Sequence, residues 1–256
     1  MRLHVHRWGD PGGRPPVLCL HGVMGHGGRF RRLARTYLAD RRVIAVDLRG
    51  HGVSGWEPLW DIVTFVADVC ETLDAEGIAQ ADVVGFSFGG RLGVELAAAH
   101  PDRVRRLALL DPAIQLAPGV ALGFADQTRP DVSFADVDEA VTARLATLAH
   151  TPREMVDEDV AEALETGADG RLRYRVARSA VVAAYGEMAR TPAIPPNCPT
   201  LLVRAANGIL DDRQEALLRD ALGDRLTIVG VPGNHPVMWD AFAQTGEAVA
   251  AHLHAA

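Results

Sequence analysis

The sequence is short of the features that mark a disulfide scaffold, a cysteine metal site or a membrane protein. Its 256 residues include three cysteines, Cys19, Cys70 and Cys198, which are too few and too scattered for a disulfide framework or a metal cage. No apolar run approaches the length that spans a bilayer. The start, MRLHVHRWGD, lacks the apolar segment of a signal peptide. These absences predict a cytoplasmic protein with reduced thiols and no bound metal.

The chain also has fewer basic residues than acidic ones. The chain has 26 Lys and Arg residues against 33 Asp and Glu residues, a net charge of −7. That balance argues against nucleic acid or an anionic membrane as the main partner and leaves a small molecule as the expected one. Hydrophobic residues make up 48% of the chain, enough to bury a sizeable core in one large α/β domain or two small ones. Whether the protein is a monomer or a homodimer stays open.

Short β-rich runs alternate with helical patterns along most of the chain. This alternation is typical of a mostly parallel central sheet flanked by helices. An antiparallel edge strand is expected over 3–8. The expected parallel strands are residues 15–22, 42–50, 81–87, 104–111, 199–205 and 225–231. The expected helices are residues 30–39, 61–76, 91–100, 212–222 and 238–252.

One interval interrupts the alternation. From about residue 112 to residue 196 no strand-like run occurs, and helical patterns such as FADVDEAVTARLATLAH and REMVDEDVAEALE take its place. The prolines of TPAIPP then lead into the next strand. We therefore expect a helical lid or cap over residues 113–196, inserted into a core formed by residues 1–112 and 197–256.

The segment DVVGFSFGG places Ser87 between two glycines, where a strand gives way to a helix. G-x-S-x-G in this context is a nucleophile elbow, a turn so sharp that the serine is held in unfavourable backbone angles. A Cβ at Gly85 or Gly89 would collide with the neighbouring helix or strand. The turn also aims the N-terminus of the following helix at the reacting centre. A serine in a purely structural β–α turn is the alternative reading.

A nucleophilic serine needs a base and donors for an oxyanion. Among ten histidines, His235 follows the last apolar strand and lies at the carboxyl edge of the sheet, where Ser87 also lies. The expected oxyanion donors are the backbone N–H of Phe88, directly after the serine, and that of Val23 in the glycine-rich loop HGVMGHGG. His21 in this loop is interpreted as a residue that holds the loop in shape.

Four segments together resemble the α/β-hydrolase fold family in their order and rough spacing. They are HGVMGHGG, DLRGHGVSG, GFSFGG and PGNHPVMW, and the similarity covers nearly the whole chain. The resemblance implies a serine hydrolase without a cofactor, in which Ser87 attacks an acyl carbon, His235 shuttles the proton and water releases the acyl-enzyme. Relatives that open epoxides or remove halides use an aspartate in place of Ser87, so those reactions are disfavoured.

The third member of the catalytic triad departs from the family pattern. In most of the family it is an acid in the turn after the strand matching PTLLVRA, and the equivalent position here is Gly208. A carboxylate must reach the imidazole to fix its tautomer. Asp111, at the end of VRRLALLD, matches the place where haloalkane dehalogenases and some other members keep their acid. Asp211 is a second candidate, although it can equally cap the helix that follows.

A mostly apolar pocket is expected between sheet and cap. Its candidate lining residues include Met24, Trp239 and Tyr185, and further candidates are Phe88, Phe124 and Phe134. His26 and Arg29 are candidates to face the site from the glycine-rich loop. The arginines of RLRYRVAR (Arg171, Arg173, Arg175 and Arg178) are candidates for binding a substrate carboxylate, but a solvated basic face explains them more simply.

The predicted function is cleavage of a carboxylic ester, or a related acyl bond, in a small to medium, largely apolar substrate. The same residues would also serve a thioesterase, a lactonase, a C–C bond hydrolase or an acyltransferase, because the cap selects the leaving group. A non-catalytic ligand-binding member of the fold is the alternative from another class, and the missing acid at Gly208 is the feature that favours it.

Overall fold

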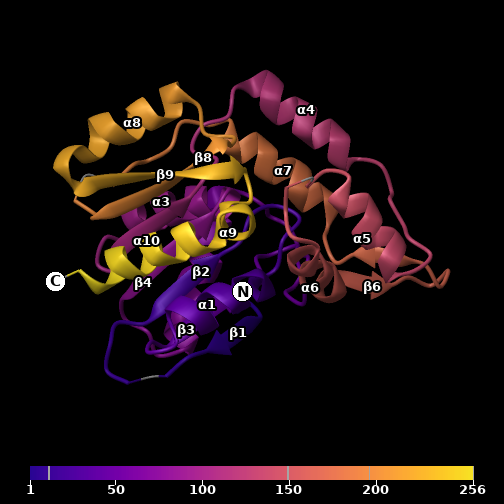
Figure 1. Cartoon of the computed structure of the whole chain (residues 1–256), viewed down its shortest axis with the longest axis horizontal. Helices are drawn as coiled ribbons and strands as arrows, with labels where there is room; N and C mark the ends of the chain where they lie inside the picture. Colours follow the sequence, from indigo (N-terminus) through magenta and orange to yellow (C-terminus); the bar gives the residue numbers. More distant parts are fainter. Residues whose placement is uncertain (11, 149, 196, 256) are drawn as a thin grey trace.

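A seven-stranded sheet forms the centre of the computed structural model, which describes residues 1–10, 12–148, 150–195 and 197–255 (Figure 1). The strand order is β1-β3-β2-β4-β5-β8-β9, and β1 pairs antiparallel with β3 while the other neighbours pair parallel. This arrangement confirms the expected fold class. The strands are β1 Val5–Trp8, β2 Val17–Leu20, β3 Val43–Val46, β4 Ala81–Phe86, β5 Val104–Leu110, β8 Thr200–Asn207 and β9 Leu226–Asn234.

Helices cover both faces of the sheet. The central strand β4 shows this by alternation, since Val83 packs into one apolar cluster and Val84 into another. The first cluster lies under α2 (Ile62–Ala75), α3 (Phe88–Ala99) and α8 (Asp212–Leu222). The second lies under α1 (Arg31–Tyr37), which follows the short 3₁₀ helix η1 (Gly27–Phe30), and α10 (Phe242–His254). A second 3₁₀ helix, η2 (Gly223–Arg225), leads into β9.

The C-terminal helix expected over 238–252 is in fact two helices. α9 (Val237–Asp240) ends at Ala241, whose backbone angles of φ −129° and ψ 49° are not helical, and α10 begins directly after it. The break lets α9 run past the end of the sheet next to β9 while α10 packs on α1 and β8. His235 lies just before α9 and therefore at the carboxyl edge of the sheet.

Residues 113–195 form a separate group of elements beyond that edge (Figure 1). The helices are α4 Pro118–Thr128, α5 Val137–Leu145, α6 Arg153–Ala163 and α7 Arg178–Met188. The prediction that this interval contains no strand was wrong, because Leu164–Thr166 (β6) and Leu172–Tyr174 (β7) form an antiparallel hairpin. Each strand has three residues and carries charged, partly exposed side chains, so neither shows an apolar strand pattern. The expected boundary at residue 196 lies outside the described residues.

Arg91 on α3 fastens both ends of this inserted segment to the core. Its buried guanidinium donates to the carbonyl oxygen of Ile114, at 2.7 Å, and to that of Arg190, at 2.8 Å. These two carbonyls lie just before α4 and just after α7. The chain thus leaves and re-enters the core at one place, directly behind the helix that begins after Ser87.

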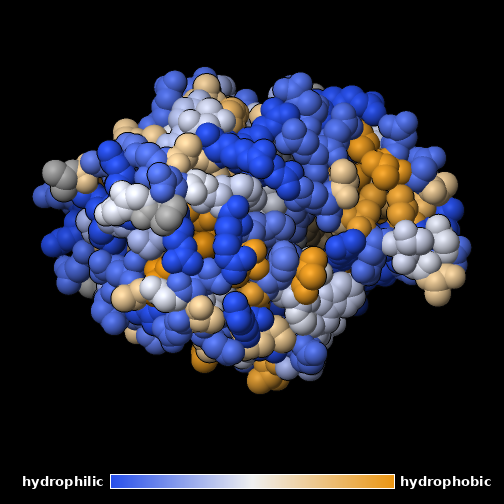
Figure 2. Space-filling view, turned by 90° about the horizontal axis from the view of Figure 1, so that it is seen from below, coloured by the Kyte–Doolittle hydropathy of each residue, from blue (hydrophilic) through white to orange (hydrophobic). Residues whose placement is uncertain are grey.

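Exposed apolar side chains gather on the inserted segment. They include Val120, Leu122, Val132 and Val137. In Figure 2 a group of hydrophobic atoms lies at the same end of the molecule as this segment in Figure 1. No helix within the described ranges is long and apolar enough to cross a membrane.

The turn between β4 and α3 is tight enough to exclude side chains at both flanking glycines. A Cβ on Gly85 would lie 2.4 Å from the carbonyl oxygen of Gly89, and a Cβ on Gly89 would lie 2.0 Å from that of Leu20. Both distances are far inside van der Waals contact, and the obstructing atoms belong to the backbone. The two glycines let α3 pack directly against β2 and β4 while the chain reverses at Ser87.

We expect Gly89→Ala to lower the free energy of unfolding by about 3 kcal/mol, since the new methyl group can be accommodated only by moving backbone. Urea denaturation followed by circular dichroism measures this change. Gly186→Ala is the matched control: Gly186 is also helical, and a Cβ there meets no atom within 4 Å. The control is expected to gain about 0.5–1 kcal/mol from its higher helix propensity. Equal midpoints for the two variants would contradict this account of the turn.

Candidate active site

Ser87 and His235 line one cavity of about 610 Å³ between the sheet and the inserted segment. We call this space the Ser87 cavity. The serine is 5% exposed, and its backbone angles are φ 54° and ψ −117°, a left-handed conformation that side chains rarely adopt. Its carbonyl oxygen accepts hydrogen bonds from the N–H groups of Gly90, Arg91 and Ala113. These bonds hold the turn on both sides, from α3 and from the chain that follows β5.

Strained backbone is concentrated at this site. Among the described residues, three non-glycine positions have positive φ: Met24 at 59°, Ser87 at 54° and Asp111 at 38°. Met24 and Ser87 line the Ser87 cavity, and Asp111 contacts His235, which also lines it. Conformations of this kind cost about 1–3 kcal/mol each and persist where the surrounding structure enforces them. Their convergence at one place marks a functional site.

His235 is held by a buried carboxylate. Its Nδ1 lies 2.7 Å from Oδ2 of Asp111, a side chain with no exposed surface. Asp111 also accepts hydrogen bonds from the backbone N–H groups of Ile209, at 2.9 Å, and Ala205, at 3.3 Å. An ionised carboxylate only accepts, so Nδ1 carries the proton and Nε2 is left as an acceptor. The imidazole stacks on the ring of Phe86, with centroids 4.7 Å apart.

Gly208 leaves room for the Asp111 carboxylate. A Cβ on Gly208 would lie 2.2 Å from Oδ1 of Asp111, so the Asp111 carboxylate occupies the space that a side chain at position 208 would need. Asp211, the second candidate, accepts a hydrogen bond from the Gln214 N–H at 2.8 Å and caps α8. The structure therefore brings Asp111 to His235 and leaves Asp211 at a helix terminus.

The glycine-rich loop after β2 lies directly against the serine. A Cβ on Gly22 would lie 2.8 Å from Cβ of Ser87, which shows how closely the loop backbone approaches it. Among the described residues, the N–H groups of Val23 and Phe88 have no backbone acceptor. Phe88 is the first residue of α3, where an N–H has no partner within the helix. Neither N–H group is therefore engaged by a backbone acceptor within the described residues.

His21 holds this loop as the sequence predicted. Its Nε2 accepts the Leu48 N–H at 2.9 Å, and its Nδ1 lies 2.7 Å from the carbonyl oxygen of Gly22. The first bond requires a free lone pair on Nε2, so the proton is on Nδ1, which donates to Gly22. Burial lowers the pKa of His21 well below its usual value and keeps the ring neutral. His21 acts as a brace between two loops and does not line the Ser87 cavity.

Asp47 braces the far end of the same loop. Its two oxygens accept the N–H groups of Gly27, at 2.7 Å, and Val53, at 2.9 Å. Burial opposes its ionisation, but these bonds and one from His6 outweigh burial and hold the Asp47 pKa well below its usual range. His4, His6 and Asp47 also place metal-ligating atoms within 4.8 Å of one another. None of the three lines the Ser87 cavity.

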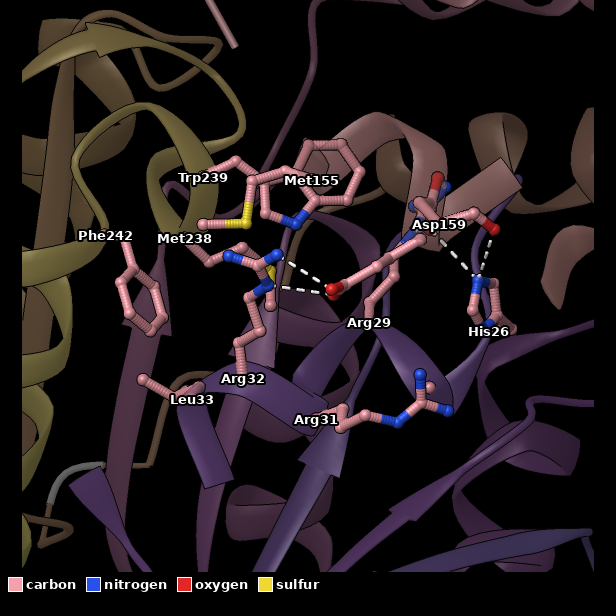
Figure 3. A pocket seen from close by; sticks show the side chains of 12 residues that line it. His26, Arg29, Arg31, Arg32, Leu33, Met155, Asp159, Met238, Trp239 and Phe242 are labelled. Carbon is pink, nitrogen blue, oxygen red and sulfur yellow. Dashed lines mark hydrogen bonds and ion pairs between the residues drawn. The ribbon is translucent and has the colours of Figure 1, made fainter. Parts of the chain in front are cut away.

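A buried ion-pair cluster joins the glycine-rich loop to the inserted segment. Asp159 on α6 accepts hydrogen bonds from Nε of Arg29 at 2.5 Å, from Nη2 of Arg29 at 2.9 Å and from Nε2 of His26 at 3.0 Å. Arg29 also donates to the Met24 carbonyl oxygen at 3.1 Å and lies over the Trp239 ring, 5.3 Å from its centroid. Figure 3 shows Asp159 pointing from α6 toward His26. The cavity drawn there holds about 20 Å³, too little for a substrate.

The predicted substrate-binding residues line the Ser87 cavity. Met24, Trp239 and Tyr185 all contribute to its wall, and Tyr185 packs on Phe124 with ring centroids 5.6 Å apart. Burial raises the pKa of Tyr185 to about 12, so its hydroxyl stays neutral. Phe134 lies instead in a second, outer cavity. His26 is turned away to Asp159, whereas Arg29 reaches the wall.

Several lining residues were not singled out from the sequence, Asn234 and Arg144 among them. Asn234 adjoins His235 at the end of β9. Arg144 belongs to α5, in a segment without any motif, so no sequence signal pointed to it.

Comparisons with known proteins agree on the family. The family model described as the alpha/beta hydrolase fold matches residues 15–242. The chain is 36% identical to lipase LipV of Mycobacterium tuberculosis, over 92% of this chain and 91% of that protein. It is 29% identical to the 3-hydroxybutyrate-oligomer hydrolase of Cupriavidus necator, over 93% of this chain and 89% of that protein.

Solved structures show the same architecture. The crystal structure of E-2-(acetamidomethylene)succinate hydrolase superposes with a TM-score of 0.89 at 22% identity, covering 99% of this chain and 95% of that one. At this identity the match supports the fold. Together with the family match, which spans most of the sequence, it establishes that the chain is an enzyme of the alpha/beta hydrolase fold family.

Proposed function

We propose that the protein is a serine esterase that cleaves carboxylic esters through an acyl-enzyme on Ser87. The observation that carries this proposal is the pair formed by His235 and the buried Asp111, 2.7 Å apart, beside a cavity that also contains a strained serine. Relatives named lipase and esterase support an ester as the substrate. The mostly apolar wall of the Ser87 cavity suits a small to medium acyl group.

In the first half of the reaction, Oγ of Ser87 attacks the ester carbonyl carbon as Nε2 of His235 takes the hydroxyl proton. The carbonyl oxygen becomes an oxyanion, and the N–H groups of Val23 and Phe88 are the donors that receive it. The N-terminus of α3 adds a favourable dipole. Asp111 keeps the Nδ1 proton in place and stabilises the imidazolium. The intermediate collapses, and His235 gives its proton to the departing alcohol.

In the second half, a water molecule attacks the acyl-enzyme. Nε2 of His235 takes a proton from the water, and a second oxyanion forms between the same two N–H groups. Collapse releases the carboxylic acid and returns the proton to Oγ of Ser87. Apart from the ester and water, each step uses only groups of the chain.

We further propose that residues 113–196 act as a cap that selects the substrate, over a core of residues 1–112 and 197–256. Helices α4, α5 and α7 supply Phe124, Arg144 and Tyr185 to the wall of the Ser87 cavity. The Asp159–Arg29 contact links the cap to the loop that carries Val23. Cap position and oxyanion-hole geometry are therefore coupled.

A fluorophosphonate probe together with a panel of p-nitrophenyl esters, thioesters and lactones tests the proposal. The wild-type protein is expected to be labelled and to hydrolyse short and medium esters faster than the other substrates. Ser87→Ala removes the nucleophile and His235→Ala removes the base, so each should lower kcat by about 10⁴-fold or more. Labelling should disappear in Ser87→Ala. A wild-type protein that takes no label, or a Ser87→Ala variant that keeps its activity, would contradict the proposal.

The proposed role of Asp111 as the triad acid is tested by removing its carboxylate and by placing a carboxylate at position 208 instead. Asp111→Asn should lower kcat by about 10³- to 10⁴-fold, because it removes the acceptor that fixes the His235 tautomer. Asp111→Gly should be similarly impaired, and adding Gly208→Asp to it should recover at least about tenfold, since the new carboxylate enters the space that Asp111 vacates. Asp211→Asn is the control and should keep kcat within about twofold, because Asp211 caps α8. Near-wild-type turnover in Asp111→Asn would refute this assignment.

A further inference from the structure

Arg144 carries a positive charge at the inner end of the cap without a partner. It is one of two arginines that line the Ser87 cavity, and it also lines the outer cavity of about 500 Å³ beneath Phe134 and Tyr174. Its Nε is buried and has no hydrogen-bond partner. Across the described residues, no hydrogen bond or salt bridge involves its side chain. The guanidinium stays charged at any physiological pH.

The other arginines in this region are paired. Arg29 donates two hydrogen bonds to Asp159. In the outer cavity, Arg173 and Arg178 both pair with Asp131, and Arg173 also pairs with Asp169. The basic run that the sequence suggested for carboxylate binding is thus largely engaged by cap residues. Arg144 lacks such a partner although it faces the same two cavities.

Nearby acids do not neutralise Arg144. The wall of the Ser87 cavity contains no Asp or Glu among the described residues. Asp159 is close enough to attract Arg144, but both of its oxygens already accept bonds from Arg29, and His26 bonds one of them. Asp131 and Glu165 line the outer cavity, where Asp131 is paired and the exposed Glu165 forms no salt bridge with Arg144. Desolvation, together with the nearby charge of Arg29, lowers the Arg144 pKa although Asp159 attracts the guanidinium.

We propose that Arg144 binds a carboxylate of the substrate, so that the preferred ester carries an anionic group at the end remote from the scissile carbonyl. This inference rests on the esterase function proposed above and names its substrate class. Arg144 is half-buried, and its Nε, shielded from water, has no partner. A cation in such a place is costly unless a ligand pairs with it, and a guanidinium matches a carboxylate through two parallel hydrogen bonds. A single free guanidinium balances a single negative charge, which favours a carboxylate over a phosphate dianion.

The rest of the cavity fits a substrate of this kind. The cavity is lined in part by Phe124, Leu148 and Met188, whose apolar side chains can contact an aliphatic chain. Gln127 lines both cavities, as Arg144 does, and an amide can supply further donors. A volume of about 610 Å³ suits a metabolite-sized ester.

Matched esters test the proposal: p-nitrophenyl pentanoate and mono-p-nitrophenyl glutarate have acyl chains of the same length, ending in a methyl group or a carboxylate. We expect wild-type protein to prefer the glutarate monoester in kcat/KM. Arg144→Gln should lower kcat/KM for it by about 10- to 100-fold and change the pentanoate ester by less than about threefold. For Arg144→Lys, kcat/KM for the glutarate monoester should lie between the values for the wild type and Arg144→Gln. Lysine keeps the positive charge but lacks the two parallel N–H donors of the guanidinium. Pairs of p-nitrophenyl esters with longer acyl chains, again ending in a methyl group or a carboxylate, show at which chain length the preference for the carboxylate is largest.

Arg153→Gln is the matched control. Arg153 is exposed on α6, lines neither cavity, and its loss changes the net charge by the same amount. It should leave the ratio of the two kcat/KM values unchanged. Equal efficiency toward both esters in the wild type, or a proportional loss for both in Arg144→Gln, would overturn the proposal. A stronger preference for a phosphonate-ended ester would overturn the carboxylate assignment.

Binding to the Ser87→Ala protein separates this proposal from the esterase function. Calorimetry with monomethyl glutarate measures the anion site without turnover, and Kd should rise about 10- to 100-fold when Arg144→Gln is added. If binding depends on Arg144 but the wild-type protein cleaves no ester, the anion site is retained and the esterase is rejected. Ester cleavage without charge discrimination and without Arg144-dependent binding would reject the anion site and retain the esterase.

Discussion

The site depends on one unfavourable backbone conformation, that of Ser87. At φ 54° and ψ −117° the serine lies outside the regions that side chains normally occupy, and a chain free to relax would leave it. Relaxation is blocked by the hydrogen bonds at the Ser87 carbonyl and by the close packing of Gly85, Gly89 and Gly22 around the turn. The result is a hydroxyl fixed at the carboxyl edge of the sheet, where the N-terminus of α3 and the glycine-rich loop also meet.

The strained turn at Ser87 is linked by a hydrogen bond to the turn that holds a second strained residue, Asp111. Ala113 donates to the Ser87 carbonyl, so the elbow is tied to the turn in which Asp111 has its own positive φ. Asp111 in turn excludes any side chain at Gly208. A carboxylate at the end of β5 and a side chain at position 208 therefore exclude each other, because they would occupy the same space. The absence of an acid at position 208 thus fits the proposal that Asp111 takes that role.

The sequence predicted the sheet well because its strands are buried on both faces and read as continuous apolar runs, such as VLCL and VIAV. Ser87 and His235 could be located because a motif and a position after the last strand identify them. The choice between Asp111 and Asp211 needed the fold, since only packing shows which carboxylate reaches the imidazole. The β6–β7 hairpin was missed because Glu165 and Arg173 break any apolar pattern. Arg144 was missed because an unpaired charge is defined by its surroundings.

The most direct test of the account is a crystal structure of the protein inactivated by a fluorophosphonate. Phosphorus should be bonded to Oγ of Ser87, with the phosphonyl oxygen about 2.7–3.1 Å from the backbone nitrogens of both Val23 and Phe88. Nδ1 of His235 should still lie on Asp111. A phosphonyl oxygen turned away from both nitrogens, or an adduct on another residue, would contradict the claim that the strained turn at Ser87 assembles the site.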